Sequence, residues 1–224
     1  MRRFALPLAL FAAVLVALAA AWFTLTGKGG GGERIAAEAP PVGPFTQIGL
    51  NGFAELVLVQ GDRESVTIEA SPRASARIRV RSADGRLSID AVEDRPWWSF
   101  LAHGTPRPPR ITVHFRNLES LDVAGAVKVA AASIETQQLA IEASGATSVK
   151  VDALRAQSLR FSGSGAVKGE FAGALDDQSI AIAGAGDYRA PGLESQTARI
   201  AVSGAGRAVV RVAKRLDAEI SGAG

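Results

Sequence analysis

The chain has 224 residues, of which 47% are hydrophobic and only 6% aromatic, and it contains no cysteine. This length corresponds to one or two domains with a buried core, and the absence of cysteine excludes disulfides, thiol catalysis and zinc–thiolate sites. The net charge of +3 comes from Arg2, Arg3 and Lys28, because basic and acidic residues are equally frequent in the rest of the chain. A balanced domain of this kind lacks the basic stripe that binding to nucleic acid requires.

Residues 1–27 have the pattern of an export segment. Two arginines precede an uncharged apolar stretch from Phe4 to Leu25, an arrangement that keeps the basic end in the cytoplasm. The stretch is long enough for a membrane-spanning helix, which needs about 20 residues, although the small residues near its end also suit a cleaved signal peptide. We therefore expect residues 28–224 to lie on the periplasmic side of the cytoplasmic membrane if anchored, or in the cell envelope or secreted if cleaved.

The chain after this segment divides into a tether and a β-rich region. Residues 28–44 are rich in Gly, Ala and Pro and predict a flexible tether. Short alternating segments with β-branched residues follow, separated by turns at Gly52, Gly61-Asp62 and Asp84-Gly85. The expected strands are residues 46–60, 65–70, 76–81, 86–90 and 110–115. Residues 93–109, with four prolines, predict an irregular insertion.

Residues 116–224 contain an internal repeat of about 20 residues, in which a short strand of alternating apolar residues leads into a glycine-rich turn. The repeat predicts an all-β domain over residues 45–224, built as a right-handed, single-stranded parallel β-helix. Each unit would form one coil, that is, one circuit of the chain. The expected turn glycines, where only a residue without a side chain permits a sharp corner, are Gly145, Gly163, Gly165, Gly184, Gly186, Gly204 and Gly206.

Stacked coils should place like residues in ladders. Within one strand, Ile182 is expected to point inward and Ala181 outward. One expected ladder contains Leu121, Leu139, Leu159, Ile180 and Ile200, and the next contains Val123, Ile141, Phe161, Ile182 and Val202.

The glycine turns also carry a family resemblance. The pattern SGAG or a close variant recurs at Ser162–Gly165, Ala183–Gly186, Ser203–Gly206 and Ser221–Gly224, after an N-terminal β region that begins FTQIGLNGFAELVLVQGD. In these features residues 45–224 resemble the exported bacterial GIN domain family, described as an autotransporter adhesin head. The resemblance implies a β-helical cell-envelope domain without an established catalytic activity. A fold of this kind does not by itself fix a function.

Trp97, Trp98 and Phe100 in the insertion are the candidate ligand-binding residues. Adjacent tryptophans can stack on sugar rings or dock a partner, because each combines a large apolar area with an N–H donor. The alternative is that the insertion covers a side or an open end of the solenoid.

One basic residue follows the turn of each coil, which suggests a second candidate surface. Stacked, these residues could form a basic ladder that binds an anionic glycan or a lipid headgroup. The alternative is a solvated face balanced by acids such as Asp152 and Glu170. The basic residues are Lys128, Lys150, Lys168, Arg189 and Arg211.

No catalytic, metal or cofactor site is predicted. Asp176 and Asp177 form an acidic pair in an expected connecting turn, without the opposing carboxylate that glycoside hydrolysis needs. His103 and His114 lack the spacing of metal ligands, and His114 is expected to point outward from a strand. The glycine turns lack the following helix that a phosphate-binding loop requires.

These patterns predict a non-catalytic cell-envelope module that binds a glycan or a protein surface, or that has a structural role, and that contacts no nucleic acid. One alternative is a carbohydrate-active enzyme, a polysaccharide lyase or hydrolase, on the same scaffold. Another is an accessory or sensor domain that signals through the N-terminal helix, which the flexible tether disfavours.

Overall fold

The computed structural model describes residues 35–38, 42–91 and 108–224. The predicted hydrophobic helix of residues 1–27 and most of the predicted insertion lie outside the described residues. In the described part, the one helix is α1 (Pro72–Ser75), a single turn that Ser71 caps by accepting a hydrogen bond from the backbone N–H of Ala74. No helix in this part has the length and hydrophobicity that a membrane span requires.

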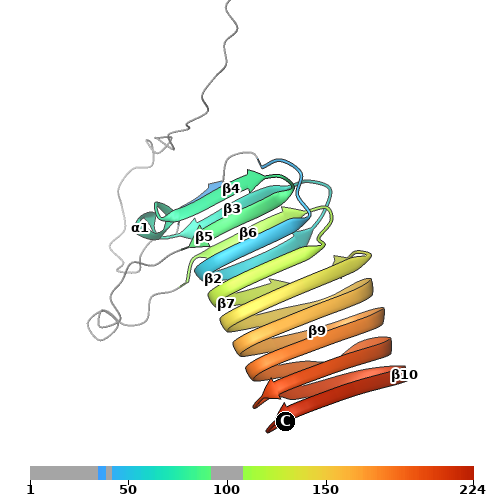
Figure 1. The fold of residues 1–224 in the computed structure, drawn as a ribbon. Helices are drawn as coiled ribbons and strands as arrows, with labels where there is room; N and C mark the ends of the chain where they lie inside the picture. The colour runs from blue at the N-terminus through green and yellow to red at the C-terminus, as the bar shows by residue number, and fades with distance from the viewer. Residues whose placement is uncertain (1–34, 39–41, 92–107) are drawn as a thin grey trace, which may run out of the picture. The chain divides into compact units, whose positions relative to one another are not determined.

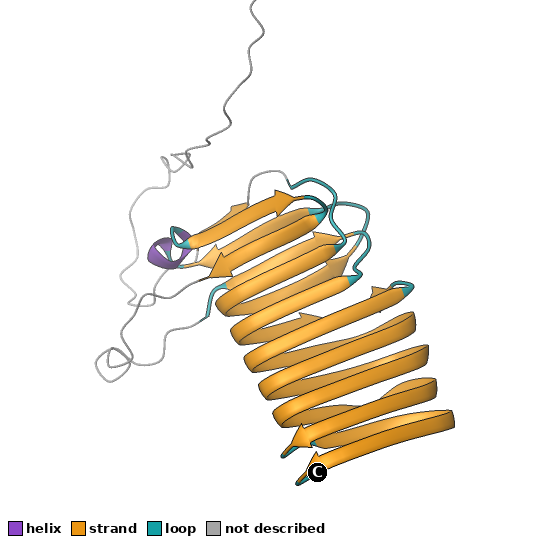
Figure 2. Ribbon diagram, in the orientation of Figure 1, coloured by secondary structure: helices purple, strands orange, loops and turns teal. Residues whose placement is uncertain are grey.

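The described residues are otherwise almost entirely β-strand (Figure 2). The strands are β1 (Ile35–Glu38), β2 (Gln47–Gln60), β3 (Ser65–Ala70), β4 (Ile78–Ala83), β5 (Arg86–Ala91), β6 (Arg110–Phe115), β7 (Ser120–Ala131), β8 (Ile134–Glu135), β9 (Gln138–Gly204) and β10 (Arg207–Gly222).

Most strand pairs are parallel, and they join segments far apart in the sequence. Strand β2 pairs along its length with β7, its first half also pairs with β5, and its second half also pairs with β6. Strands β7 and β10 pair with β9, which winds through the stacked layers of Figure 1 as one continuous ribbon. The predicted all-β class is therefore confirmed, whereas the right-handed β-helix stays a prediction.

The N-terminal strands depart from parallel pairing. Strand β3 pairs antiparallel with β6 and β1, and β4 pairs antiparallel with β5. The turn between β4 and β5 has positive φ at both Asp84 and Gly85, as expected for a two-residue hairpin. Strand β1 lies inside the segment predicted to be a flexible tether. This part of the segment is a strand because its backbone pairs with the edge of β3 that would otherwise be exposed.

Close backbone contacts between glycines set the register of the stack. Seven glycines have φ between +84° and +123°, a region that residues with a side chain rarely adopt. In each of the last six, a Cβ atom would collide with the backbone of the preceding member, for example 2.6 Å from the carbonyl oxygen of Gly125 at position 145. We call this set the glycine column. Its members are Gly52, Gly125, Gly145, Gly165, Gly184, Gly204 and Gly222.

Some of the glycines predicted to form turns have a different role in the structure. Gly52 lies inside β2 and begins the column, so it does not form a turn between strands. The remaining predicted turn glycines, Gly163, Gly186 and Gly206, lack a positive φ. At these positions a Cβ atom would meet apolar side chains, such as the Cγ1 atom of Val202 at 2.7 Å from position 206. These glycines therefore leave room for inward side chains.

The ladders also differ from the prediction in their first rungs. Strand β7 places Leu121 beside Ile141 and Val123 beside Ala143, not beside the predicted Leu139 and Ile141. The reason is that the corner glycine, not the first leucine of each unit, fixes the offset between coils.

The alternation around Ile182 follows the prediction. Ile182 is 3% exposed, and Ala181 is exposed. However, Gly184 lies against Gly165, so Ile182, two residues earlier, lies over Gly163 and not over Phe161 as expected.

One buried polar network lies among these inward residues. The hydroxyl of Tyr188 donates to Oε1 of Gln178 at 3.1 Å, and Nε2 of Gln178 donates to Oγ of Ser195 at 2.7 Å. The Ser195 hydroxyl in turn donates to the carbonyl oxygen of Arg211 at 3.0 Å. Burial raises the pKa of Tyr188 above its ordinary value, so the hydroxyl stays a neutral donor. The network gives the buried side chains of Tyr188, Gln178 and Ser195 hydrogen-bond partners, and the buried hydroxyl of Thr147 separately donates to the carbonyl oxygen of Ser144 at 2.9 Å.

Replacement of Gly184 by Ala tests the glycine column. The new Cβ atom would lie 2.9 Å from the carbonyl oxygen of Gly165 on a backbone with φ of +108°, and strain of this kind costs about 1–3 kcal/mol. We expect a lower midpoint in urea unfolding. The control is Gly61→Ala, where no heavy atom lies within 4 Å of the new Cβ and φ is not in the glycine-favouring region. Equal losses in the two variants would contradict the role of the column.

Candidate binding groove

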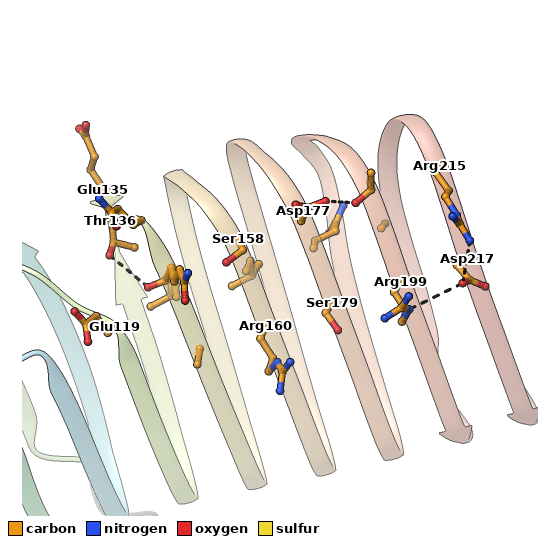
Figure 3. Close-up of a pocket in the computed structure, with 18 of the residues that line it drawn as sticks. Glu119, Glu135, Thr136, Ser158, Arg160, Asp177, Ser179, Arg199, Arg215 and Asp217 are labelled. Carbon is orange, nitrogen blue, oxygen red and sulfur yellow. Dashed lines mark hydrogen bonds and ion pairs between the residues drawn. The ribbon is translucent and has the colours of Figure 1, made fainter.

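A polar groove runs across successive coils on one side of the stack (Figure 3). Its volume is about 1390 Å³. Most of its lining side chains are charged or carry hydroxyl or amide groups, and Leu139 and Leu159, which also line it, are each 1% exposed. Together with these two leucines, the groove is lined by Asn117, Glu119, Glu135, Thr136, Gln137, Gln138, Ala140, Ser158, Arg160, Asp177, Gln178, Ser179, Thr197, Ala198, Arg199, Arg215 and Asp217.

The glycine column arranges these side chains in two rows along the stack. Residues five positions before a column glycine face outward in one row, and residues seven positions before it face outward in another, because side chains on a strand alternate. The strand pairing of Asp217 with Arg199 and of Arg215 with Thr197 agrees with this count. The first row contains Ala140, Arg160, Ser179, Arg199 and Asp217. The second contains Gln138, Ser158, Asp177, Thr197 and Arg215.

Positive charge gathers at the end of the groove nearest β10. The Asp217 carboxylate is shared between two arginines, with 4.0 Å to Nε of Arg199 and 3.9 Å to Nη2 of Arg215. The hydroxyl of Thr197 donates to the carboxylate of Asp177. This end is lined by three guanidinium groups, of Arg160, Arg199 and Arg215, and by two carboxylates, of Asp177 and Asp217. Among the described residues Arg160 forms no ion pair.

The opposite end of the groove is acidic and held by polar contacts. The side-chain amide of Gln60 donates to the carbonyl oxygen of Glu135 at 2.8 Å, and its oxygen accepts from the N–H of the same residue at 2.7 Å. The hydroxyl of Thr136 donates to Oδ1 of Asn117 at 3.0 Å. The side-chain amide of Gln60 thus pairs with the backbone of Glu135 as a neighbouring strand would, and it holds β8 beside the groove.

None of the sequence-predicted site residues that the structure describes lines the groove. Trp97, Trp98 and Phe100 lie outside the described residues. The predicted turn glycines form corners or inward positions and contribute no side chain to the groove. His114 is half-buried between two buried neighbours and contacts Oγ of Ser65 at 3.3 Å, in agreement with an outward strand position. Within the described part of the chain, no three acidic, His or Cys side chains are grouped to bind a metal ion.

Two predictions about charged residues are corrected. Asp176 and Asp177 lie inside β9 and not in a connecting turn, and Asp177 lines the groove. The sequence gives little indication that Asp177 lines a groove, because only the strand register shows which residues align with it on the neighbouring coils.

The predicted basic ladder does not form. The pairing places Lys128 beside Ser148 and Lys150 beside Ala130, so successive basic residues fall in different rows. Four of them pair with acids two to seventeen positions away. These ion pairs are Lys150–Asp152, Lys168–Glu170, Arg189–Asp187 and Arg211–Glu194, at 2.9, 2.6, 2.9 and 2.9 Å. The result is a balanced, solvent-exposed face, which was the alternative interpretation.

Comparisons with known proteins agree with this architecture. Residues 44–224 match the family described as "Putative auto-transporter adhesin, head GIN domain". The chain therefore belongs to this family. No curated protein is significantly similar to it in sequence.

Three solved structures illustrate the shared fold. A "putative adhesin" from Bacteroides fragilis has 18% identity and a TM-score of 0.77, with 85% of this chain and 86% of that chain covered. A "putative adhesin" from Parabacteroides distasonis has 15% identity and a TM-score of 0.57, and a "Putative lipid binding protein" from the same species has 14% and 0.51. Both of these comparisons cover 85% of this chain and 96% of the other.

The balanced face gives a prediction about pH. A hydrogen bond from Lys168 lowers the pKa of Glu170, and the charges of Lys168, Lys150 and Arg189 lower it further. Because the folded-state pKa is depressed, this interaction stabilises the fold at neutral pH and is lost as the pH falls through that pKa. We expect Lys168→Met to raise the pKa of Glu170, measured by NMR titration of its carboxyl carbon. Lys214→Met, a change at an exposed residue of β10, should leave it unchanged. An unaltered titration in the first variant would contradict the ion pair.

Proposed function

We propose that this GIN domain is a non-catalytic, adhesin-like binding module of the cell envelope, and that the polar groove holds its ligand. The observation that supports the proposal is the alignment of polar side chains in two rows across several coils. Such rows present repeated hydrogen-bonding groups along the stack. They suit an extended ligand better than a small compact one, which usually occupies a deep apolar pocket.

A polyhydroxylated chain is the ligand that matches this lining. The groove offers hydroxyl groups from Ser158, Ser179 and Thr197 and amide groups from Gln137 and Gln138. These groups can donate and accept hydrogen bonds, as sugar hydroxyls do. A glycan of the envelope is therefore our first choice, and a polar protein surface is the second.

The scaffold proposed for this role is a parallel β-helix over residues 45–224. The stack of positive-φ glycines at intervals of 18–20 residues after Gly125 supports this assignment, because a repeat of this length with parallel pairing is typical of a solenoid. A rigid stack of this kind keeps its outward rows in fixed alignment.

A blocking substitution tests the groove. Ser179→Tyr should weaken retention of the full chain on a bound glycan at least tenfold, because the ring would occupy the groove. The glycan would first be identified on a glycan array. The control is Ser148→Tyr, which changes an equally half-buried serine beside Lys128 on the other face.

Three outcomes would contradict the proposal. The first is that no glycan or envelope protein binds the full chain. The second is equal binding by both variants, which would place the ligand elsewhere. The third is release of shortened or unsaturated sugars, which would favour a polysaccharide lyase or hydrolase.

Trp97, Trp98 and Phe100 are proposed as a further contact for the ligand. The double variant Trp97→Ala/Trp98→Ala serves in the same retention assay. Reduced retention at unchanged thermal stability would support binding, and lower stability would support the alternative of a cover for the fold.

The location of the domain outside the cytoplasm is a separate proposal, supported by the pattern of residues 1–27. We expect the full chain to fractionate with the membrane or the envelope. N-terminal sequencing of the mature protein distinguishes an anchor, which keeps Met1, from a cleaved signal peptide. A cytoplasmic, membrane-free product would overturn the proposal.

A further inference from the structure

We infer that the ligand of the polar groove is an anionic polysaccharide, and that one of its acidic groups binds at Ser179 between Arg160 and Arg199. This inference rests on the proposed function and adds the chemical class of the ligand. It concerns a different set of residues from those of the predicted basic ladder, four of which form ion pairs with nearby acids.

The three residues are brought together only by the stacking of coils. Each lies five positions before a glycine of the column, namely Gly165, Gly184 or Gly204. They therefore occupy neighbouring positions in one outward row, and Figure 3 shows them on successive coils. Two strand spacings separate the arginines, a Cα distance of about 9.5 Å. Ser179, which has a shorter side chain, leaves a gap between the longer side chains.

The guanidinium groups around this gap have N–H donors that are not engaged in close ion pairs. Arg160 has no ion pair within the described residues, and its neighbours in the row are Ala140 and Ser179, neither of which is charged. The side chain of Arg199 is 77% exposed, and its one carboxylate partner, Asp217, lies 4.0 Å away and is shared with Arg215. Arginine stays protonated and presents a fork of N–H groups that fits a carboxylate or a sulfate.

The lining favours a polysaccharide over a lipid headgroup as the source of the acidic group. A membrane-binding surface presents exposed apolar side chains that enter the lipid beside its basic residues. Here the two leucines that line the groove, Leu139 and Leu159, are buried, and the exposed lining carries hydroxyl, amide and charged groups. These groups can bind the sugar hydroxyls on both sides of an anionic substituent.

The test compares dextran sulfate with dextran, two polymers with the same backbone, on the full chain in 50 mM and 500 mM NaCl. We expect at least tenfold tighter binding to dextran sulfate at low salt, and a smaller preference at high salt because salt screens exposed charges. The variant Arg160→Gln/Arg199→Gln should lose this preference. The control Arg79→Gln/Arg207→Gln makes the same change in net charge at two exposed arginines that do not line the groove, and it should keep the preference.

Several outcomes would overturn the inference. Equal binding of the two polymers by the unmodified chain would show that the groove does not select anions. An equal loss of the preference for dextran sulfate in the groove variant and in the control would show that the preference depends only on net charge. Tighter binding to phosphatidylglycerol vesicles than to dextran sulfate, lost in the groove variant, would replace the polysaccharide with a membrane.

These results are separable from a failure of the proposed function. If Ser179→Tyr still blocks a neutral glycan while dextran sulfate has no advantage, the groove binds its ligand and only the anionic class is wrong. If no polymer or glycan binds the unmodified chain, the proposed function itself fails.

Discussion

The close approach of backbones at the glycine column is the constraint on which the rest of the structure depends. Each glycine after Gly52 lies against the backbone of its predecessor so closely that a Cβ atom would overlap it. This contact fixes which residue of one coil lies over which residue of the next. Every other row, inward or outward, keeps a constant offset from it, since side chains on a strand alternate strictly between two faces.

The inward rows satisfy packing, and the outward rows are free to vary. Inward positions hold apolar residues, or glycines where a neighbouring side chain needs space, as at Gly206. One polar network and the hydroxyl of Thr147 enter the interior, and each of these side chains is hydrogen-bonded, in keeping with the rule that buried polar groups are paired. The fold thus needs little more than small residues at the corners and apolar residues inside. This explains how structures with 18% identity or less share it.

The two outward faces use their charges differently. On the face with Lys168 and Glu170, basic and acidic residues pair within one strand or between neighbouring strands, and the charge is neutralised locally. Along the groove, by contrast, one carboxylate serves two arginines, and Arg160 is left without an ion pair in the described part of the chain. Because outward and inward side chains alternate, the residues of the charge-balanced face and of the groove can change without altering the core.

The sequence by itself determined the all-β class and the alternation that buries Ile182 and exposes Ala181. These features depend on local periodicity, which a single strand carries in its own residues. It also marked the hairpin turn at Asp84-Gly85, because positive φ at two successive residues has a clear residue preference.

Only the tertiary structure decided the register. Where a unit contains two glycines, either could occupy the corner, and the choice depends on contact with the preceding coil. Gly184 was selected over Gly186 because its neighbour in that coil is Gly165, whereas position 186 lies against the side chain of Ile182. That choice brings Arg160, Ser179 and Arg199 into one row. The sequence could not identify the groove, because its residues are about 20 positions apart and share no motif.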